Sequence, residues 1–578
     1  MFFGIILPLV LFFLVLAVLV YALGEYLGWS FRKEMNVEEG FSRFFDYLER
    51  YVEKPIIKPV EKLIYRLGGI DPTVSMNWKT YLLSALWLNL ILFVFLYLIF
   101  LFQGGLPLNP AEVGNLDWDL AFHNAATFVS NTNQQHYAGE TALSYFSQLG
   151  AVLLAMFVSA ATGMGLLVGF TKGLTNEEDP RLGNFFVAFI KSLTRFLIPI
   201  SFLLALFLIS QGVPQTLSGP ASVSTLEGAT QTIARGPVAT HEAIKMLGTN
   251  GGGFFAANAA HPFENPTPLS NVVLNLFLLL GTISTFYAFG IWVKKRKHGL
   301  VLVGAVSVLV IVFLAMAIGG EAGGNPALDG MGIESSQGNM EGKEVRFGAT
   351  LSALWGVSTT STTNGGVNSM HDSFTALGGL ALFLGMSLNS LFAGVGTGVM
   401  NLLTYVFLAG FMGALMIGRA PGYLGKRLES DEIKFAAMII LLLPTLVLFP
   451  TGIAVVTNMG KEAITNPGFH GFSQVMYEFF SAAANNGSGF EGLMDNTVFY
   501  NMTGGFVILL ARYIPLVLQL MIAGSLAKKK IRPETEGTLK VENVPFLVLL
   551  LVIMVVIGGL VFIPALSLGP IAELLSSW

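Results

Sequence analysis

The sequence contains no cysteine and very few charged residues. Without cysteine the chain cannot form disulfides, iron–sulfur clusters or thiolate zinc sites. Only 12% of its 578 residues are charged, about half of the ~25% that is typical of soluble globular chains. So few charges cannot cover a water-facing surface of this size, which excludes a soluble enzyme, a nucleic-acid-binding protein and a disordered scaffold. With 53% hydrophobic residues, the composition predicts an all-α polytopic membrane protein.

Motifs of nucleotide and zinc chemistry are also missing. The sequence has no phosphorylatable Asp-Lys-Thr-Gly motif and no Walker loop, since the Gly-Lys pair at 425–426 is followed by Arg427. His241-Glu242 does not complete a zinc-binding HExxH pattern, because Lys245 stands where the second histidine is required. We therefore expect no catalytic residues in this chain, and energy for active transport has to come from another chain or from an ion gradient.

Ten apolar stretches are long enough to cross a membrane, which takes about 20 mostly apolar residues. They are residues 2–23, 78–101, 145–170, 185–209, 269–293, 300–318, 374–418, 433–452, 503–527 and 544–568. The first stretch does not resemble a signal peptide, because no basic residue precedes it and its apolar core is too long.

Lysine and arginine are distributed unevenly between the connections. The connections after spans one, three, five, seven and nine hold 26 of the 32 basic residues, and the opposite connections hold five. By the positive-inside rule, this bias predicts ten crossings with both termini outside. The outside connections then carry 18 acidic residues, which would concentrate cations at the outer face. A solvated face is the alternative reading, since the rule alone depletes lysine and arginine there.

The stretch 374–418 is too long for one straight crossing, because a helix of its length would extend roughly 67 Å at about 1.5 Å per residue. Two full crossings would put Arg419, Lys426 and Arg427 outside, against the charge bias. We therefore expect a single crossing broken at residues 394–398, GVGTG. Irregular backbone at membrane depth has to be buried in protein or line a water-filled cavity. Close helix packing through small residues is the alternative explanation of this motif.

Four outside connections share one pattern, a short helical run followed by a polar cluster. The runs and clusters are 121–129 with Ser130-Asn131-Thr132-Asn133, 238–247 with GTNGGG (248–253), 351–358 with TTNGG (362–366), and 475–483 with ANNGSG (484–489). When Asn133, Gly251, Gly365 and Gly487 are aligned, the spacings are 118, 114 and 122 residues. Self-similarity at a nearly fixed period indicates internal repeats, each consisting of a span, a short helix, a polar loop and a span.

This unit suits a cation filter. The C-terminal ends of short re-entrant helices carry about half a negative charge, and loop carbonyls can replace the water shell of a dehydrated ion. Glycine permits the unusual backbone dihedral angles that this requires. Asparagine also tolerates positive φ, so we expect asparagine to replace glycine in the first loop, which contains no glycine. Any one cluster could be an ordinary Asn-Gly turn. Four at matched spacing on one side favour a filter.

The candidate cation-binding residues follow from this alignment. They are Asn131, Thr132, Asn133, Asn250, Gly251, Gly252, Asn364, Gly365, Gly366, Asn486, Gly487 and Ser488. The predicted fold has four pseudo-symmetric helix–pore loop–helix repeats around one selectivity filter, with one extra helix at each end. The predicted segments are an extra helix at 1–24, a cytoplasmic connection at 25–77, repeats at 78–172, 184–297, 298–419 and 433–530, and a C-terminal helix at 541–578.

Two arginines lie at unusual places. Arg512 lies inside the ninth span, where buried charge is rarely without a function. The spans contain almost no acidic residues, so we expect Arg512 to pair with backbone carbonyls at a pore-helix end or to contact a partner subunit. Arg419 ends the broken seventh crossing, either as a positive-inside anchor or as a barrier to cation exit.

Five segments carry a resemblance to a known family. They are GTNGGGFF (248–255), AHPFENPTP (260–268), MHDSFTALGG (370–379), LMIGR (415–419) and SAAANNGSGFEGL (481–493). With the four repeats, they resemble the potassium-translocating A subunit of the Kdp-type potassium-transporting ATPase over nearly the whole chain. The resemblance implies a bacterial or archaeal plasma-membrane protein of the potassium channel/transporter superfamily, with potassium as its substrate and no organic cofactor.

The resemblance also implies partners and a role. Such subunits capture scarce external potassium in the four-loop filter and work with a P-type ATPase B subunit, a single-span C subunit and often a small F peptide, among membrane lipid and without nucleic acid. One departure is Gln134-Gln135-His136, where an aromatic residue is expected beside Asn133. A stand-alone potassium channel or cation symporter of the same superfamily is the alternative. The extra first and last spans disfavour it, and so do the residues of the five motifs.

Overall fold

The computed structural model describes residues 2–37, 40–325, 328, 331–332, 337–416, 418, 420–533 and 540–576. Within these residues, ten helical segments are long and apolar enough to cross a membrane, as the sequence predicts. They are Ile6–Ser30, Trp78–Gly105, Ser147–Thr175, Phe185–Ser210, Pro268–Trp292, Arg296–Ala322, Thr397–Met416, Ser430–Val456, Val498–Leu526 and Val544–Leu566. The sixth begins earlier than the predicted stretch 300–318 and includes Arg296 and Lys297 in its first turn.

The first half of the chain contains the extra N-terminal helix and two of the units that the sequence pattern describes. Its elements are α1 (Phe2–Ser30), α2 (Arg43–Leu48), α3 (Lys58–Leu67), α4 (Trp78–Phe102), α5 (Trp118–Val129), α6 (Gly139–Ala142), α7 (Leu154–Thr175), α8 (Phe185–Lys191), α9 (Ile198–Ser210), the hairpin strands β1 (Ala221–Ser224) and β2 (Thr230–Ile233), α10 (Val238–Leu247) and α11 (Pro268–Trp292).

The second half repeats the same order and ends in short terminal helices. Its elements are α12 (Arg296–Ala322), α14 (Gly348–Ser361), α15 (Ala376–Ser387), α16 (Thr397–Met416), β3 (Gly422–Tyr423), β4 (Lys426–Arg427), α17 (Ser430–Val456), α18 (Asn458–Lys461), α19 (Phe469–Ala484), α20 (Val498–Leu526), α21 (Val544–Ile553), α22 (Ile563–Leu566) and α23 (Pro570–Ser576).

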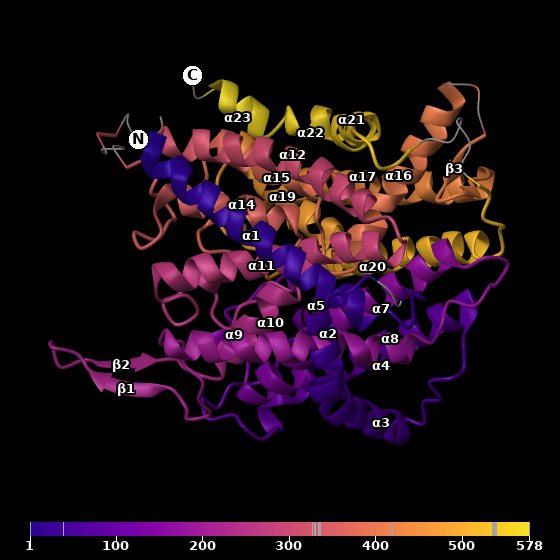
Figure 1. The fold of residues 1–578 in the computed structure, drawn as a ribbon. Coiled ribbons are helices and arrows are strands. Elements are labelled where there is room, and N and C mark those ends of the chain that lie inside the picture. The colour runs from indigo at the N-terminus through magenta and orange to yellow at the C-terminus, as the bar shows by residue number, and fades with distance from the viewer. Residues whose placement is uncertain are drawn as a thin grey trace.

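The connections alternate between two ends of the helical bundle. Figure 1 shows the start of α1, the terminal helix α23 and the β1–β2 hairpin at one end, and the β3–β4 hairpin at the other. At the β3–β4 end, Lys426 donates hydrogen bonds to the carbonyls of Gly173 in α7 and Leu526 in α20. Arg296 forms an ion pair with Glu25 near the end of α1. The connections that the charge bias groups together therefore lie at one end of the molecule.

The seventh crossing is broken, as predicted, but the break starts earlier than the glycine motif. Helix α15 ends at Ser387, and α16 begins at Thr397. Residues 388–396 between them are irregular and largely buried. The break therefore includes Gly394 and Gly396, while Gly398 already belongs to α16. We refer to residues 388–396 as the break.

Four helices that lie between spans are too short to cross a membrane. They are α5, α10, α14 and α19, which have 12, 10, 14 and 16 residues and therefore extend about 15–24 Å. Most of their residues are buried, including polar ones such as Asn124 and Gln474. Each ends at one of the four polar clusters, so the helical elements position these clusters deep inside the bundle.

Candidate functional site

The four polar clusters are called loop 1 (residues 130–133), loop 2 (248–253), loop 3 (362–366) and loop 4 (485–489). Each follows a helix that ends in the same cap, in which a loop N–H donates to the carbonyl five residues earlier. The four bonds run from Thr132 to Thr127, from Asn250 to Lys245, from Asn364 to Thr359 and from Asn486 to Ser481, with N···O distances of 2.9–3.0 Å. The repeats that the spacing predicts thus have the same local backbone structure.

Each loop also has two residues with positive φ, separated by one residue. The pairs and their φ angles are Asn131 and Asn133 (70° and 57°), Thr249 and Gly251 (52° and 88°), Thr363 and Gly365 (48° and 87°), and Asn485 and Gly487 (53° and 107°). Loop 1 has asparagine at both positions, which is the substitution expected from the sequence, because asparagine is one of the few residues that tolerate this conformation.

Glycine is required in loops 2, 3 and 4 because neighbouring loops touch backbone to backbone. A Cβ atom on Gly251 would overlap the carbonyl oxygen of Asn364 in loop 3. A Cβ on Gly365 would overlap the carbonyl of Asn486 in loop 4, and one on Gly487 would overlap the carbonyl of Thr132 in loop 1. A residue with a side chain at these positions would push the loops apart.

Asparagine side chains also connect the loops to one another. Asn131 of loop 1 donates to the carbonyl of Thr249 in loop 2 (2.8 Å). Asn364 of loop 3 donates to the carbonyl of Lys245 at the end of α10 (2.9 Å), and Asn486 of loop 4 donates to the carbonyl of Thr359 in α14 (2.9 Å). Asn485 of loop 4 donates to Oγ1 of Thr132 (3.0 Å). The contacts join loop 1 to 2, 2 to 3, 3 to 4, and 4 back to 1, so the loops form a closed ring.

Hydroxyl groups in the re-entrant helices hold the loop backbone in place by accepting hydrogen bonds from loop N–H groups. Thr359 Oγ1 accepts a hydrogen bond from the Gly365 N–H, and Ser481 Oγ accepts one from the Gly487 N–H, both at 2.9 Å. Thr127 Oγ1 stands at the same position before loop 1, but it accepts the N–H of Gln134, one residue further along than in loops 3 and 4. The corresponding position in α10 is Lys245. The spacing pattern did not single out these hydroxyls, although the shared interval of six residues from helix to glycine is visible in the sequence.

The fourth position, Lys245, is buried and carries a charge next to the ring. Its Nζ lies 2.6 Å from Glu242 Oε2 and 2.6 Å from Glu264 Oε2, and all three side chains are fully buried. Burial alone would lower the pKa of Lys245, but the two carboxylates outweigh it and raise the pKa. Burial raises the pKa of Glu242, whereas for Glu264 the charge of Lys245 outweighs burial and lowers the pKa, so the ammonium is paired with the Glu264 carboxylate.

The two glutamines that depart from the family pattern connect loop 1 to its neighbours. Gln135 accepts a hydrogen bond from the Gly253 N–H (2.7 Å) and donates one to the Gly253 carbonyl (3.1 Å), which pairs its amide with the backbone of loop 2. Gln134 donates to the carbonyl of Glu478 in α19 (3.5 Å). Gln135 therefore bridges loops 1 and 2, and Gln134 connects the end of loop 1 to α19.

The break is hydrogen-bonded directly to the ring. The N–H groups of Phe392 and Ala393 donate to the carbonyl of Ser361, the last residue of α14 (3.1 and 2.9 Å). Thr249 Oγ1 of loop 2 accepts the N–H of Val395 (3.0 Å). Thr282 of α11 donates to the carbonyls of Phe392 and Ala393 (2.7 and 2.8 Å). The break is therefore held against loops 2 and 3 by specific bonds.

Glycines let the break approach α7 closely. A Cβ on Gly396 (φ 79°) would lie 2.5 Å from the carbonyl oxygen of Gly163 in α7, and one on Gly163 would lie 2.6 Å from the carbonyl of Val395. These contacts show that part of the GVGTG motif does serve close packing. The same segment also lies beside the ring, since the Val395 N–H donates to Thr249 of loop 2.

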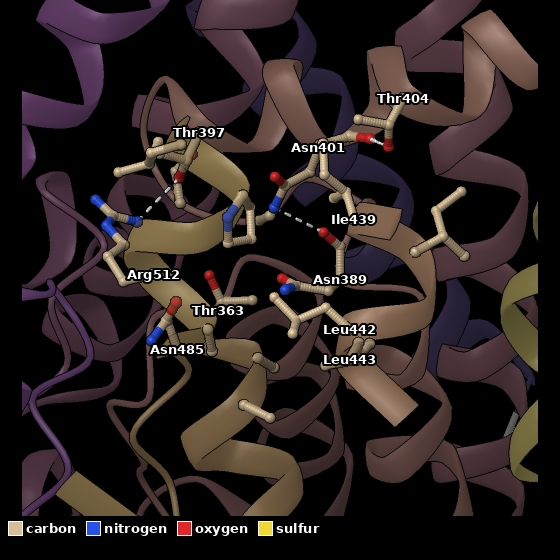
Figure 2. A pocket seen from close by; sticks show the side chains of 18 of the residues that line it. Thr363, Asn389, Thr397, Asn401, Thr404, Ile439, Leu442, Leu443, Asn485 and Arg512 are labelled. Atoms are coloured by element: carbon tan, nitrogen blue, oxygen red, sulfur yellow. Dashed lines mark hydrogen bonds between the residues drawn. The ribbon is translucent and has the colours of Figure 1, made fainter. Parts of the chain in front are cut away.

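A cavity lies between the ring and the break, with about 50 Å³ of free volume. Figure 2 shows Thr363 of loop 3 and Asn485 of loop 4 on one side of it, and Asn389 of the break and Asn401 of α16 nearby. Leucines and isoleucines of α17 form an apolar wall. Because one water needs about 10–15 Å³ of such volume, the cavity can hold a few waters or a partly hydrated ion.

Arg512 of α20 lies at the edge of this cavity (Figure 2). Its Nη1 lies 3.4 Å from Oγ1 of Thr397, the first residue of α16. Within the described residues it forms no ion pair and no hydrogen bond to a backbone carbonyl, so the expected carbonyl partner is not found. The arginine is a buried positive charge beside the polar end of the cavity. Arg419 lies outside the described residues.

Comparisons with known proteins bear on the identity of the site. The family described as Potassium-transporting ATPase A subunit matches residues 10–575. A curated relative named potassium-transporting ATPase potassium-binding subunit, from Halobacterium salinarum, is 50% identical over 570 residues and covers 98% of this chain and 97% of the relative. A relative of the same name from Geobacillus kaustophilus is 44% identical over 566 residues and covers 98% of each. Among solved structures, the potassium transporter TrkH from Vibrio parahaemolyticus aligns with 75% of this chain and 84% of its own, with a TM-score of 0.49 and 15% identity.

Proposed function

Since the chain belongs to the Potassium-transporting ATPase A subunit family, we propose that it is the potassium-binding and translocating subunit of an ATP-driven, high-affinity potassium uptake complex. The relatives that carry the name potassium-binding subunit match it over almost its full length. The chain itself lacks phosphorylation and nucleotide-binding motifs, so it acts as a non-catalytic subunit and ATP is hydrolysed by a partner.

The closed ring of four loops is the observation that carries the assignment of the filter. The proposed ligand residues are Asn131, Thr132 and Asn133 in loop 1, Asn250, Gly251 and Gly252 in loop 2, Asn364, Gly365 and Gly366 in loop 3, and Asn486, Gly487 and Ser488 in loop 4. Four helix C-termini end at this ring, and each contributes about half a negative charge. Loop carbonyls replace the hydration shell of potassium as it enters.

The remaining assignments follow from the family and from the charge bias. The partners are a P-type ATPase B subunit, a single-span C subunit and a small F peptide. The complex lies in a bacterial or archaeal plasma membrane, and the end of the bundle with α23 and the start of α1 faces outside. The four repeats occupy 78–172, 184–297, 298–419 and 433–530, between an extra helix at each end.

The break closes the direct route from the filter to the cytoplasm. Its hydrogen bonds to Ser361 and Thr249 hold it against the inner side of the ring, and the guanidinium of Arg512 adds a positive charge beside the cavity. A cation that has passed the ring is therefore blocked by the break and repelled by the positive charge of Arg512. It leaves sideways toward the ATPase subunit, which keeps the pump from leaking.

Potassium flux through liposomes tests this function. The chain alone and the whole complex are reconstituted, and passive flux is compared with ATP-driven flux. We expect little passive flux through the chain alone and ATP-dependent uptake by the complex. Rapid passive flux that the partners do not diminish would instead indicate a stand-alone channel of the same superfamily.

A further inference from the structure

A buried cluster of one histidine and two carboxylates lies behind loop 1. His136, three residues after Asn133, points its Nε2 at Glu478 Oε1 of α19 (3.1 Å) and at Asp495 Oδ2 (3.8 Å). The three atoms all lie within 4.8 Å of one another. The side chains of His136 and Glu478 are buried, and that of Asp495 is 24% exposed. The cluster joins the segment after loop 1 to the helix and the segment that flank loop 4.

The other ring nitrogen of His136 is fixed by a hydrogen-bond relay. Nδ1 lies 2.7 Å from Oδ1 of Asn501. The Asn501 amide group donates to Asp119 Oδ2 (2.9 Å) and to Asn496 Oδ1 (3.1 Å), so its oxygen has to face the histidine. Nδ1 therefore donates its hydrogen to Asn501, and Nε2 points toward both carboxylates. Metal-binding histidines are commonly oriented in this way by an acceptor on the distal nitrogen.

The two carboxylates of the cluster share a single basic side chain. Among the described residues, neither Glu478 nor Asp495 forms an ion pair with lysine or arginine, and His136 is their shared partner. Burial alone would lower the pKa of His136, but Asp495 and Glu478 outweigh it and raise the pKa to about 9. Burial and the neighbouring Glu478 also raise the pKa of Asp495 to about 7, although His136 opposes this. A divalent cation in place of the bound protons would balance both carboxylates.

A second histidine ring lies against the cluster. The ring of His123 in α5 stacks on that of His136 with 3.8 Å between centroids. His123 is fully buried, and neither ring nitrogen has a hydrogen-bond partner of ordinary geometry among the described residues. A Cβ on Gly504 would lie 3.5 Å from His123 Nε2 and 3.9 Å from Glu478 Oε1. Gly504 therefore brings no side chain against either atom.

Another histidine shows what an ordinary ion pair looks like in this protein. His470 has one carboxylate on each ring nitrogen, Asp372 Oδ1 on Nε2 and Glu573 Oε1 on Nδ1, both at 3.0 Å. That arrangement fits a protonated ring that donates twice. Burial opposes the charge, but the two carboxylates raise the pKa of His470 to about 10. In contrast, His136 has both carboxylates on the same nitrogen.

The cluster can be reached from the surface. Asp495 lines an open pocket of about 470 Å³ together with Glu462, Asn496 and Thr497. The pocket is lined by Met459 of α18, by the two residues that follow this helix, and by the segment from Met494 to the start of α20. An ion that enters it meets the exposed side of Asp495 before it reaches Glu478 and His136.

We propose that His136, Glu478 and Asp495 bind a divalent transition metal, with zinc as the best match. Zinc takes histidine nitrogen and carboxylate oxygen at about 2.0–2.2 Å, which places tetrahedral donors roughly 3.3–3.6 Å apart. The 3.1 and 3.8 Å separations lie on either side of that value. An imidazole in the donor set favours zinc over magnesium or calcium. The metal would tie loop 1 to α19, beyond the proposed transport function.

Zinc binding to the purified complex tests the proposal. The complex is stripped with a chelator and titrated with zinc, and in a parallel arm with magnesium, while bound metal and melting temperature are measured. We expect one saturable zinc per chain with a rise in melting temperature, and no such effect of magnesium. His136→Ala and Asp495→Asn should each weaken zinc binding at least tenfold. His470→Ala should bind zinc like the wild type, because its ring is not in the cluster.

A spectroscopic readout separates loss of the metal ligands from loss of the fold. Cobalt(II) in the site should give the visible absorption of a four-coordinate centre in the wild type and in His470→Ala, and not in Asp495→Asn. Asp495 is partly exposed, so its isosteric amide should leave the fold intact, which potassium-stimulated ATP hydrolysis without zinc verifies. Absence of saturable zinc binding in the wild type, or equal binding by Asp495→Asn, would overturn the proposal.

Discussion

Loop 1 and loop 3 have the same backbone and different residues. Both follow a helix with the same cap, and both have positive φ at two positions, but Asn133 stands where loop 3 has Gly365. Gly365 is packed against the carbonyl of Asn486, so it has no room for a side chain. Asn133 is 2% exposed and keeps its side chain at the same position of the repeat. The repeats therefore share a backbone conformation, and the residue that produces it depends on what each neighbour leaves free.

Loop 1 is also held differently. Its immediate continuation, residues 134–136, bonds to loop 2 through Gln135 and to Glu478 through His136. The continuation of loop 3 is bonded to a neighbouring segment as well, since the Val367 N–H donates to Asn258 Oδ1. In addition, Ser361 directly before loop 3 accepts two N–H groups of the break. Loop 3 is thus tied to the break, whereas these bonds of loop 1 run to loop 2 and to α19. A change in loop 3 should affect both binding and translocation, whereas a change in loop 1 should chiefly affect binding.

Gly365→Ala in loop 3 should have the largest effect on potassium affinity. The substitution places a methyl group into the carbonyl of Asn486 and forces an L-residue to φ 87°. The left-handed backbone alone costs about 1–2 kcal/mol, and the overlap adds to it, so we expect at least a tenfold rise in the potassium concentration that half-saturates ATP hydrolysis. Gly365→Asp, or Gly251→Asp in loop 2, should also reduce discrimination against rubidium and sodium. The measurement is a titration of the purified complex with each cation.

Gly489→Ala in loop 4 is the matched control, because a Cβ there would meet no atom within 4 Å. Its potassium dependence should equal that of the wild type. Unchanged affinity and selectivity in Gly365→Ala would contradict the assignment of the ring as the filter.

Much of the ring was predictable, because the left-handed backbone after each re-entrant helix favours glycine or asparagine. The spacing of Asn133, Gly251, Gly365 and Gly487 located all four loops and suggested that asparagine replaces glycine in loop 1. Thr249 and Thr363 were not predicted to have positive φ, since β-branched residues rarely adopt it. Here the caps and the packing of neighbouring loops impose it on them.

The start of the break was not predictable from local sequence. Residues 388–393 (LNSLFA) contain no glycine or proline. Their helix is interrupted because Ser361 and Thr282 bind the backbone groups of Phe392 and Ala393. These partners lie 31 and 110 residues away, so only the tertiary structure reveals them. The His136 cluster was also missed, because His136 lies 342 residues before Glu478 in the sequence.

Thr359→Val should have an intermediate effect. The isosteric change removes the acceptor of the Gly365 N–H and leaves that buried donor unpaired, which costs about 1–3 kcal/mol. We expect a rise of about fivefold to tenfold in half-saturating potassium. Thr360→Val is the control, because the Thr360 hydroxyl donates within its own helix to Gly356 and supports no loop N–H. If both variants behave alike, the hydroxyl behind loop 3 does not stabilise the filter.

Asn133→Gly should have the smallest effect, and it bears most directly on why loop 1 differs. Asn133 already has φ 57°, which glycine adopts without strain, and its side-chain nitrogen and oxygen have no hydrogen-bond partner among the described residues. If the loop acts through its backbone, the glycine variant keeps the carbonyls in place and loses only about 0.5–1 kcal/mol of stability to chain entropy. Half-saturating potassium should then change by less than about threefold. Potassium-dependent ATP hydrolysis and the melting temperature, measured on the same preparation, separate the two effects. A large loss of affinity at unchanged melting temperature would mean that the Asn133 side chain contacts the ion, and that loop 1 differs from the other three in chemistry as well as in sequence.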